Sequence, residues 1–199
     1  MTGLLSIVIA YLIGSVPFGY LLVKFTTGKD VRSEGSGNIG ATNVLRSTGR
    51  IAAVATLVLD IAKGFAAVWL AGYLTNDSPE WTSAAALAVM AGHAFPIFLK
   101  FHGGKAVVSF IGAFLYLTPL PLAAVLLVFL ITVAITRHIS AGSILAAATF
   151  PIGVWIILHP PVVVLLASLI AGGFIVYRHK ANIERLHAGT ENVFSWRKQ

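Results

Sequence analysis

Residues 51–74 read IAAVATLVLDIAKGFAAVWLAGYL, and this apolar run decides the fold class. A helix needs about 20 mostly apolar residues to cross the hydrocarbon core of a membrane, so this run is long enough for one crossing. Further apolar segments lie on either side of it, at residues 4–25, 84–99, 106–118, 121–136, 144–158 and 162–177. We therefore predict an all-α integral membrane protein with about seven transmembrane helices and a single domain over residues 1–199.

The composition agrees with a membrane protein. Of the 199 residues, 57% are hydrophobic and 11% are charged, whereas a soluble domain is about one quarter charged. The net charge of +7 raises the alternative of a nucleic-acid partner. The sequence has no basic stretch interleaved with aromatics, as single-strand binding favours, so we predict contact with membrane lipid and no nucleic acid. It also has no cysteine, which excludes disulfides and thiolate nucleophiles.

The basic residues fall on one side of the predicted membrane. All but one of the 14 Lys and Arg residues end or follow the first, third, fifth or seventh segment, including Arg197 and Lys198. The loops of the other side carry Asp77 and Glu80 and no basic residue. Cytoplasmic loops are enriched in Lys and Arg, so we predict an external N-terminus and a cytoplasmic C-terminus, with the polar motif loops on the cytoplasmic face.

Segments 106–118 and 121–136 are shorter than a straight span requires. Either their helices extend into the polar flanks, or the two segments form a re-entrant hairpin. Both arrangements preserve the predicted sidedness. Near the outer ends of other segments, Trp69, Trp81 and Trp155 are expected to act as interfacial anchors.

The stretch SGNIGATNVLR at residues 36–46 is unusually polar for this chain. Its glycines permit a turn with exposed amides, Thr42 or Asn43 is placed to cap a following helix, and Arg46 lies near the first turn of that helix. Amides, a helix N-terminus and an arginine together favour an anion site for phosphate. An ordinary loop with a helix cap is the alternative. The candidate ligands are Ser36, Gly37, Asn38, Asn43 and Arg46.

A second polar element is FHGGKAV at residues 101–107. Gly103 and Gly104 permit a close approach of the backbone to a ligand, and Lys105 begins the next segment. The alternative is a tight turn with a lysine that reaches the membrane interface.

A third element, RHKANIERL at residues 178–186, follows the last segment. On a helix, His179 and Asn182 are three residues apart and share a face. A basic membrane anchor would explain Arg178 but not His179, Asn182 or the GTEN sequence around Glu191. Ser143, in the RHISAGS turn, belongs to the same polar face.

Asp60 and Lys63 lie near the middle of segment 51–74, three residues apart on one helix face. A lone charge at that depth costs several kcal/mol, so we expect the two side chains to pair or to bond with other helices. A proton path is the alternative. We assign Glu191 a structural role as well.

Three sequence elements on one face, at residues 36–46, 101–107 and 178–186, carry groups suited to binding phosphate. They indicate that the protein binds a phosphorylated ligand at the cytoplasmic membrane surface. The sequence offers weak support for covalent catalysis, because it has no cysteine and no GxSxG elbow. Metal binding is also poorly supported, since the chain has 7 acidic residues and no HExxH motif. We therefore predict no metal and no cofactor.

Taken in order and spacing, SGNIGATNVLR, GHAFPIFLKFHGGKA and RHKANIERLHAGTE closely resemble the bacterial acyl-phosphate:glycerol-3-phosphate acyltransferase family, the PlsY family. The resemblance covers nearly the whole chain and includes LDIAKG at residues 59–64. One departure is Ala106, where the family usually has glycine after the lysine. The HxxxxD motif of soluble and single-span acyltransferases is absent, since none of the 6 histidines has Asp five positions later.

The resemblance implies transfer of a fatty acyl group from acyl phosphate to the 1-hydroxyl of glycerol 3-phosphate, giving lysophosphatidic acid and phosphate in phospholipid biosynthesis. It also implies an enzyme of the bacterial inner membrane, which we expect to function as a monomer. Direct transfer without an acyl-enzyme is expected. The expected catalytic residues are Ser36, Arg46, Lys105, His179 and Asn182. The expected substrate-binding residues are Gly37, Asn38, Asn43, Gly103, Gly104, Ser143 and Arg178.

The expected chemistry is mainly positioning, because acyl phosphate is already activated. The amides of Gly37, Gly103 or Gly104, or the side chain of Asn182, are expected to stabilise the developing oxyanion. Either His179 or a substrate phosphate takes the proton, and the sequence leaves both open.

A carrier or channel for a phosphorylated or anionic solute is the rival class. Polar residues near mid-membrane, namely Asp60, Lys63 and His93, favour it slightly. The short external loops and the clustering of candidate ligands on one face count against it.

Overall fold

The computed structural model describes residues 1–194, which form helices joined by short loops and contain no β-strand. Arg197 and Lys198, both assigned above to the cytoplasmic face, lie outside the described residues. The helices are α1 (Thr2–Ser15), α2 (Phe18–Thr27), α3 (Ala41–Ser47), α4 (Arg50–Thr75), α5 (Pro79–Ala94), α6 (Val107–Leu117), α7 (Pro119–Thr136), α8 (Ile139–Leu158), α9 (Val162–Arg178) and α10 (Lys180–His187), with 3-10 turns η1 (Val31–Ser33) and η2 (Ile97–Leu99).

The predicted all-helical membrane architecture is confirmed, and the apolar segments are helical, although the first is divided between α1 and α2. Among residues 1–194, five helical stretches are long and apolar enough to cross a membrane if α1 and α2 are taken together as Thr2–Thr27, or six if the bent pair α9–α10 is also one span. Helix α6 is apolar but too short to cross a membrane, because it has only 11 residues. At about 1.5 Å per residue it is roughly 16 Å long, or about half of a 30 Å hydrocarbon core.

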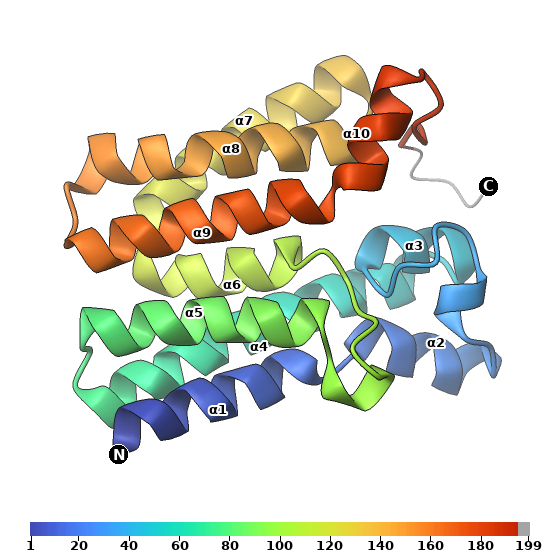
Figure 1. The fold of residues 1–199 in the computed structure, drawn as a ribbon. Coiled ribbons are helices and arrows are strands. Elements are labelled where there is room, and N and C mark those ends of the chain that lie inside the picture. Colours follow the sequence, from blue (N-terminus) through green and yellow to red (C-terminus); the bar gives the residue numbers. More distant parts are fainter. Residues whose placement is uncertain (195–199) are drawn as a thin grey trace.

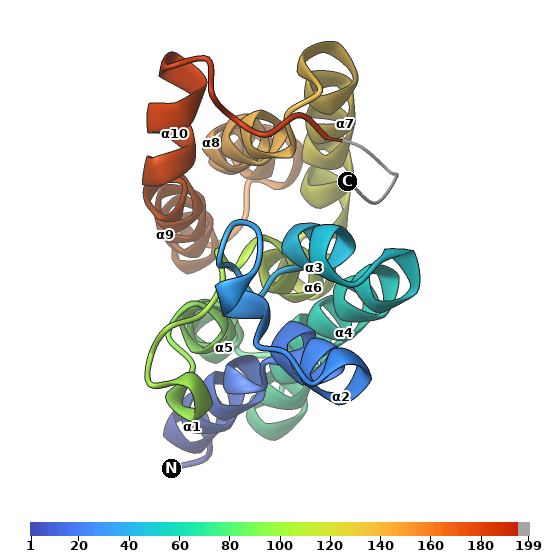
Figure 2. The ribbon, with the colours of Figure 1, turned by 90° about the vertical axis from the view of Figure 1, so that its right-hand side faces the viewer.

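The helices pack in two layers. In one layer α4 and α5 contact each other and each contacts both α1 and α6, and in the other layer α8 contacts both α7 and α9. The layers meet where α5 packs against α9 and α6 against α7. Figure 2, seen along the helices, shows α7–α10 on one side and α1–α5 on the other, with α6 between them.

Two glycines allow α4 and α6 to approach closely. A Cβ added at Gly64 would overlap the backbone of Ser109, and one added at Gly112 would overlap the backbone of Ile61. Small residues at such positions let helices pack by backbone contact in a membrane, where apolar burial drives association only weakly. This contact holds the short helix α6 against the long helix α4.

The first predicted segment is broken in the structure. Helix α1 ends at Ser15 and α2 begins at Phe18, on either side of Val16 and Pro17. Lys63 of α4 donates from Nζ to the Val16 carbonyl at 2.8 Å, and the same Nζ lies 2.8 Å from Asp60 Oδ1. The expected pairing of Asp60 with Lys63 is therefore present, and the pair also joins α4 to the break.

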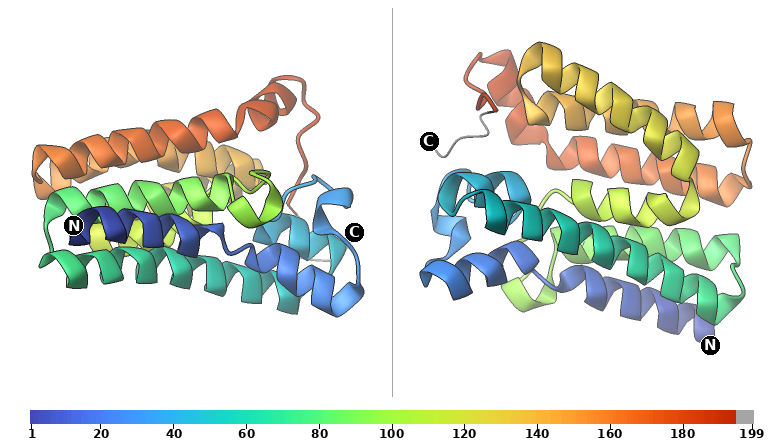
Figure 3. Two further views of the ribbon diagram at one scale, coloured as in Figure 1. Left: turned by 60° about the horizontal axis from the view of Figure 1, so that its bottom comes forward. Right: turned by 180° about the vertical axis from the view of Figure 1, so that it is seen from behind.

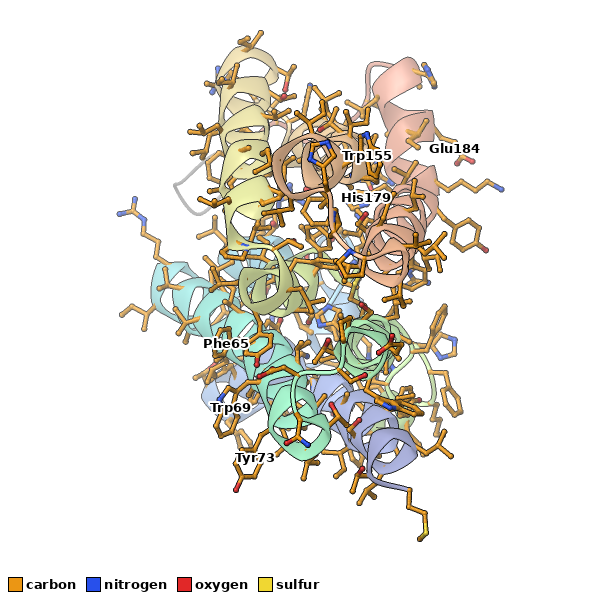
Figure 4. All side chains as sticks on the ribbon, turned by 90° about the vertical axis from the view of Figure 1, so that its left-hand side faces the viewer. Phe65, Trp69, Tyr73, Trp155, His179 and Glu184 are labelled. Carbon is orange, nitrogen blue, oxygen red and sulfur yellow. The ribbon has the colours of Figure 1, made fainter. Side chains whose placement is uncertain are left out.

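The polar motifs gather at one end of the bundle. Figures 1 and 3 show α2, α3 and α10 at this end, while the N-terminus lies at the other. A common face for the three motifs is therefore seen, and its orientation toward the cytoplasm remains a prediction. Figure 4 shows Trp69 and Tyr73 side by side on α4, and both are exposed. The ring of Trp81 instead packs against Gly3 of α1.

Candidate active site

A cavity of about 760 Å³ lies between the two layers and reaches the end of the bundle that carries the motifs. Eight of the twelve expected catalytic and substrate-binding residues line it: Ser36, Asn38, Asn43, Arg46, Lys105, Ser143, His179 and Asn182. Four do not line it: Gly37, Gly103, Gly104 and Arg178.

A hydrogen-bond network joins Lys105 to the segment after the last span. Lys105 Nζ donates to Asn182 Oδ1 at 2.5 Å, and Asn182 Nδ2 donates to Glu191 Oε1 at 2.7 Å. Glu191 also accepts from the Ser140 hydroxyl at 2.8 Å and from Arg185 Nε at 2.7 Å. Residues far apart in the sequence thus meet at one polar centre, with the carboxylate of Glu191 holding the Asn182 side chain in place.

Burial and charge tune the ionisable groups of this network. Burial lowers the pKa of Lys105 from 10.5 to about 8, and the nearby Glu191 carboxylate partly opposes that shift. Burial acts in the opposite sense on Glu191, but hydrogen bonds from Asn182, Ser140 and Arg185 outweigh it and lower the pKa of the carboxyl. At neutral pH Lys105 is therefore a cation that gives up its proton more readily than an exposed lysine.

His179 lies at the junction of α9 and α10 and faces the cavity. Its Nδ1 is 2.8 Å from the Ile175 carbonyl. A carbonyl only accepts, so Nδ1 carries the hydrogen and Nε2 is left as the acceptor. Burial lowers the pKa of His179 to about 4, so the ring is neutral at physiological pH. Figure 4 shows His179 inside the bundle, whereas Glu184 of α10 points outward.

Asn43 organises the loop of the first motif. Its amide nitrogen donates to the carbonyls of Val31, Glu34 and Asn38, and its Oδ1 accepts from the amide of Ser36 at 2.9 Å. These bonds occupy the polar atoms of the side chain. The structure therefore gives Asn43 a positioning role, in addition to its place in the cavity wall.

Helix α3 differs from the expected phosphate-binding helix. Its N-cap is Gly40, with no side-chain cap from Thr42 or Asn43, and Arg46 lies in its last turn. The helix has seven residues, and Gly40, Ala41 and Thr42 at its N-terminus line the cavity. Arg46 also lines the cavity and lies near enough to Lys105 to lower the pKa of that lysine. Helix α3 therefore brings both its N-terminal end and the charge of Arg46 to the cavity wall.

The glycine amides expected to bind an oxyanion are already in use. The amide of Gly37 donates to the Glu34 carbonyl at 3.0 Å, and that of Gly104 donates to the His93 carbonyl at 3.0 Å. The amide of Gly103 donates to the Ala94 carbonyl at 3.2 Å. That expectation was wrong for these glycines, because tertiary contacts consume their donors. The side-chain amide of Asn182 remains as a donor at the cavity.

Arg178 also differs from its expected role. Its Nη2 donates to the Gly104 carbonyl at 2.8 Å, and its guanidinium lies over the Phe95 ring. It therefore sits behind the cavity wall, against the loop that carries Lys105, and is not placed to bind substrate.

Several cavity residues were missed by the sequence interpretation. Ser140 and Arg185 reach the site through Glu191, and each lies one helical turn from a predicted residue. Asp60 and His93, which the sequence placed near mid-membrane, also line the cavity, with His93 Nδ1 3.8 Å from Asp60 Oδ1. No group of three or more His, Asp and Glu side chains among the described residues is placed to hold a metal ion.

The rest of the cavity is an apolar groove formed by α4, α6 and α7. Its wall includes Leu57 of α4, Ile111 of α6 and Leu126 of α7. Val54 and Leu130, which also line it, are 44% and 58% exposed on the outside of the bundle. In a membrane this groove would therefore meet lipid along its edges, while its polar end meets Lys105 and Arg46.

Comparison with known proteins agrees with these features. Residues 4–189 match the family model described as glycerol-3-phosphate acyltransferase. A relative of that name from Desulforamulus reducens is 46% identical to this chain, over 96% of this chain and 94% of the relative. Another, from Geobacter sulfurreducens, is 44% identical, over 98% of each chain.

Two crystal structures of PlsY, an integral membrane glycerol 3-phosphate acyltransferase, are also similar to this chain. The glycerol 3-phosphate form has a TM-score of 0.92 at 35% identity, and the lysophosphatidic acid form has a TM-score of 0.89 at 34% identity. Each match covers 98% of this chain, and 96% and 97% of the respective PlsY chains.

Proposed function

The chain belongs to the glycerol-3-phosphate acyltransferase family, and on that premise we propose that its acyl donor is an acyl phosphate. The reaction joins the 1-hydroxyl oxygen of glycerol 3-phosphate to the acyl carbon and breaks the bond between that carbon and the phosphate oxygen. The products are lysophosphatidic acid and inorganic phosphate.

One observation carries this proposal: a cation-lined polar site runs directly into an apolar groove. Arg46 and Lys105 lie at the polar end beside the Arg185–Glu191 ion pair, and apolar side chains of α4, α6 and α7 form the groove. An acyl phosphate has the same two parts, an anionic head and an apolar chain. Two cations suit a reaction in which both substrates carry phosphate, because each phosphate needs a charge partner when it leaves water.

The hydroxyl of glycerol 3-phosphate would be held by His179. The free Nε2 of its neutral ring accepts a hydrogen bond from the hydroxyl, and Asn182 donates to the oxygen that gains charge on the acyl carbon. A ring with a pKa of about 4 is a weak base. We therefore assign the proton to the departing phosphate, and His179 the task of orienting the hydroxyl.

Direct transfer is favoured over an acyl-enzyme by the surroundings of Ser36. Its amide is fixed by Asn43, and no described side chain is hydrogen-bonded to its hydroxyl as an activating base would be. Donor labelled on the acyl group, incubated without glycerol 3-phosphate, should leave no label on the protein. A stable adduct on Ser36 would overturn direct transfer.

The donor is tested with purified protein in lipid. Acyl phosphate and glycerol 3-phosphate should yield lysophosphatidic acid and one equivalent of phosphate, whereas the same chain offered as a thioester should yield neither. Transfer from the thioester alone would refute the proposed donor while leaving the family assignment intact.

The remaining parts of the proposal concern location and assembly. We propose that the protein acts as a monomer. The excess of basic residues at the motif-bearing end supports a bacterial inner-membrane enzyme whose active site faces the cytoplasm.

A further inference from the structure

Arg178, the last residue of α9, holds the loop that carries Lys105. Its Nη2 donates to the carbonyl of Gly104 at 2.8 Å and reaches that of Gly103 at 3.5 Å. Its guanidinium carbon lies 5.0 Å from the centroid of the Phe95 ring. The planar group is thus restrained on its face by an aromatic ring and at its edge by two carbonyls.

The same two glycines are fixed from the opposite side by the end of α5. The amide of Gly104 donates to the His93 carbonyl at 3.0 Å, and the amide of Gly103 donates to the Ala94 carbonyl at 3.2 Å. A Cβ at either glycine would overlap His93. The loop is therefore enclosed between α5 and Arg178, and without the guanidinium only the α5 side would hold it.

This arrangement couples the two segments that form the polar centre. Lys105 directly follows Gly104, while His179 directly follows Arg178 and Asn182 lies one turn further. Figure 1 shows the loop between α5 and α6 at the same end of the bundle as the junction of α9 and α10. The 2.5 Å contact between Lys105 and Asn182 depends on the relative position of these segments.

We infer that Arg178 is a positioning residue, which places Lys105 relative to Asn182 and His179 without contacting either substrate. Its planar guanidinium suits this task, because Nη2 contacts both carbonyls while the plane of the group packs on the Phe95 ring, which a lysine ammonium cannot do. The inference rests on the acyltransferase reaction but not on the identity of the donor, since Lys105 and Arg46 would bind glycerol 3-phosphate in either case.

The test compares Arg178→Met with Lys180→Met, which removes a positive charge from an exposed side chain two residues away. Calorimetry on detergent-solubilised full-length protein gives the Kd for glycerol 3-phosphate without any donor, and steady-state assays give kcat and KM. Arg178→Met should raise Kd and KM about tenfold and lower kcat/KM about 100-fold, because ground-state and transition-state contacts of Lys105 are both weakened. Lys180→Met should match the wild type.

A pH profile separates positioning from a general loss of folded protein. Arg178 is one of the charges that lower the pKa of Lys105. Its removal should therefore shift the high-pH decline of kcat/KM to higher pH. A partly unfolded variant would instead lose kcat while Kd, KM and the pH profile stayed unchanged, and that result would overturn the inference.

If Arg178→Met does not fold, Arg178→Lys tests the positioning role instead. Lysine keeps the charge but lacks the planar group that packs on Phe95, so Kd should rise about threefold while the pH profile stays in place. A wild-type Kd in Arg178→Lys would then refute the positioning role. Failure of the wild type to use acyl phosphate would refute the donor alone, because the Kd comparison does not involve it.

Discussion

At the scale of single residues, Lys105 carries a charge where burial makes that charge costly. Asn182 and Glu191 partly compensate that cost through the hydrogen-bond network. A phosphate bound at the site would add the remaining compensation, so the charge of Lys105 favours an anion there. Because burial lowers the pKa of Lys105 to about 8, the activity should depend on pH in a range where an exposed lysine would not titrate.

The first prediction is a decline in activity above about pH 8. Lys105 must be protonated to bind phosphate, and its pKa is lowered from 10.5 to about 8. As pH rises through this value the ammonium is lost, so kcat/KM should fall about tenfold per pH unit. Lys105→Arg should abolish the decline, because guanidinium stays charged, although its different shape should lower the maximum. An unchanged decline in Lys105→Arg would assign it to another group.

The second prediction concerns the role of His179. His179→Ala should lower kcat/KM by about 10² to 10³, because the hydroxyl is no longer oriented. His179→Gln retains an acceptor and should recover at least about tenfold of that loss, since orientation rather than proton uptake is proposed. Both variants are compared at one pH near 7.5. A glutamine variant as inactive as the alanine variant would favour His179 as the proton acceptor.

Sequence reasoning found the charged and polar site residues better than the backbone donors. Lys105, His179 and Asn182 were predicted because side-chain chemistry is visible in a motif. The amides of Gly103 and Gly104 were misassigned, because their partners on α5 are set by tertiary contacts that glycine content does not reveal.

At the scale of elements, the close contact of α4 and α6 determines where the short helix α6 lies. Hydropathy predicted both helices, since apolar runs of this kind must satisfy their backbone within a helix. It did not predict the break between α1 and α2, whose Val16 carbonyl is bonded by Lys63 of a different helix. Local patterns therefore specified the helices, whereas their interruptions depended on distant partners.

The third prediction tests that contact. Gly112→Ala should destabilise the protein by about 1–3 kcal/mol, because a Cβ there overlaps the backbone of α4. Gly173→Ala in α9 is the matched control, since nothing lies within 4 Å of its added Cβ. Thermal unfolding in one detergent measures both. Equal midpoints for the two variants would show that α4 and α6 do not rely on backbone proximity.

The fourth prediction concerns α7 and the apolar groove. The α7 lining extends from Val133 to Leu122, a rise of about 16 Å, or roughly a dozen carbons of an extended chain. Val125 lies toward the deep end and is buried. Val125→Phe should therefore lower kcat/KM for hexadecanoyl phosphate about tenfold more than for octanoyl phosphate.

Leu127→Phe is the control for that substitution, because Leu127 is exposed on α7 and does not line the cavity. It should leave the preference between the two chain lengths unchanged. Equal losses for both chain lengths in Val125→Phe would mean that the acyl chain lies elsewhere.

At the scale of the whole molecule, the two layers meet around a cavity whose polar end lies with all three motifs. Charge distribution along the sequence predicted this clustering, since loops on the same side of a membrane lie at the same end of a bundle. The sequence could not predict that α4, α6 and α7 leave a continuous apolar groove, because that depends on how two layers of helices separate. The function was therefore readable from motifs before the space for the substrate was visible.

The fifth prediction tests the orientation of the molecule. The chain has no cysteine, so a single introduced thiol is a unique label. In Glu80→Cys the thiol should react with a membrane-impermeant maleimide in intact spheroplasts, and in Lys29→Cys it should react only in inverted vesicles. The reverse pattern would place the active site on the external face.

The lipid-exposed edges of the groove have a consequence for affinity. An acyl chain that leaves the bilayer for the groove exchanges one hydrocarbon environment for another, so the roughly 0.8 kcal/mol per methylene gained on leaving water is already realised before binding. Chain length should then contribute little to net affinity, and discrimination against ordinary phospholipids would fall on the head group. Saturation should accordingly follow the mole fraction of donor in the membrane, so diluting the bilayer with inert lipid would slow the reaction at constant bulk concentration.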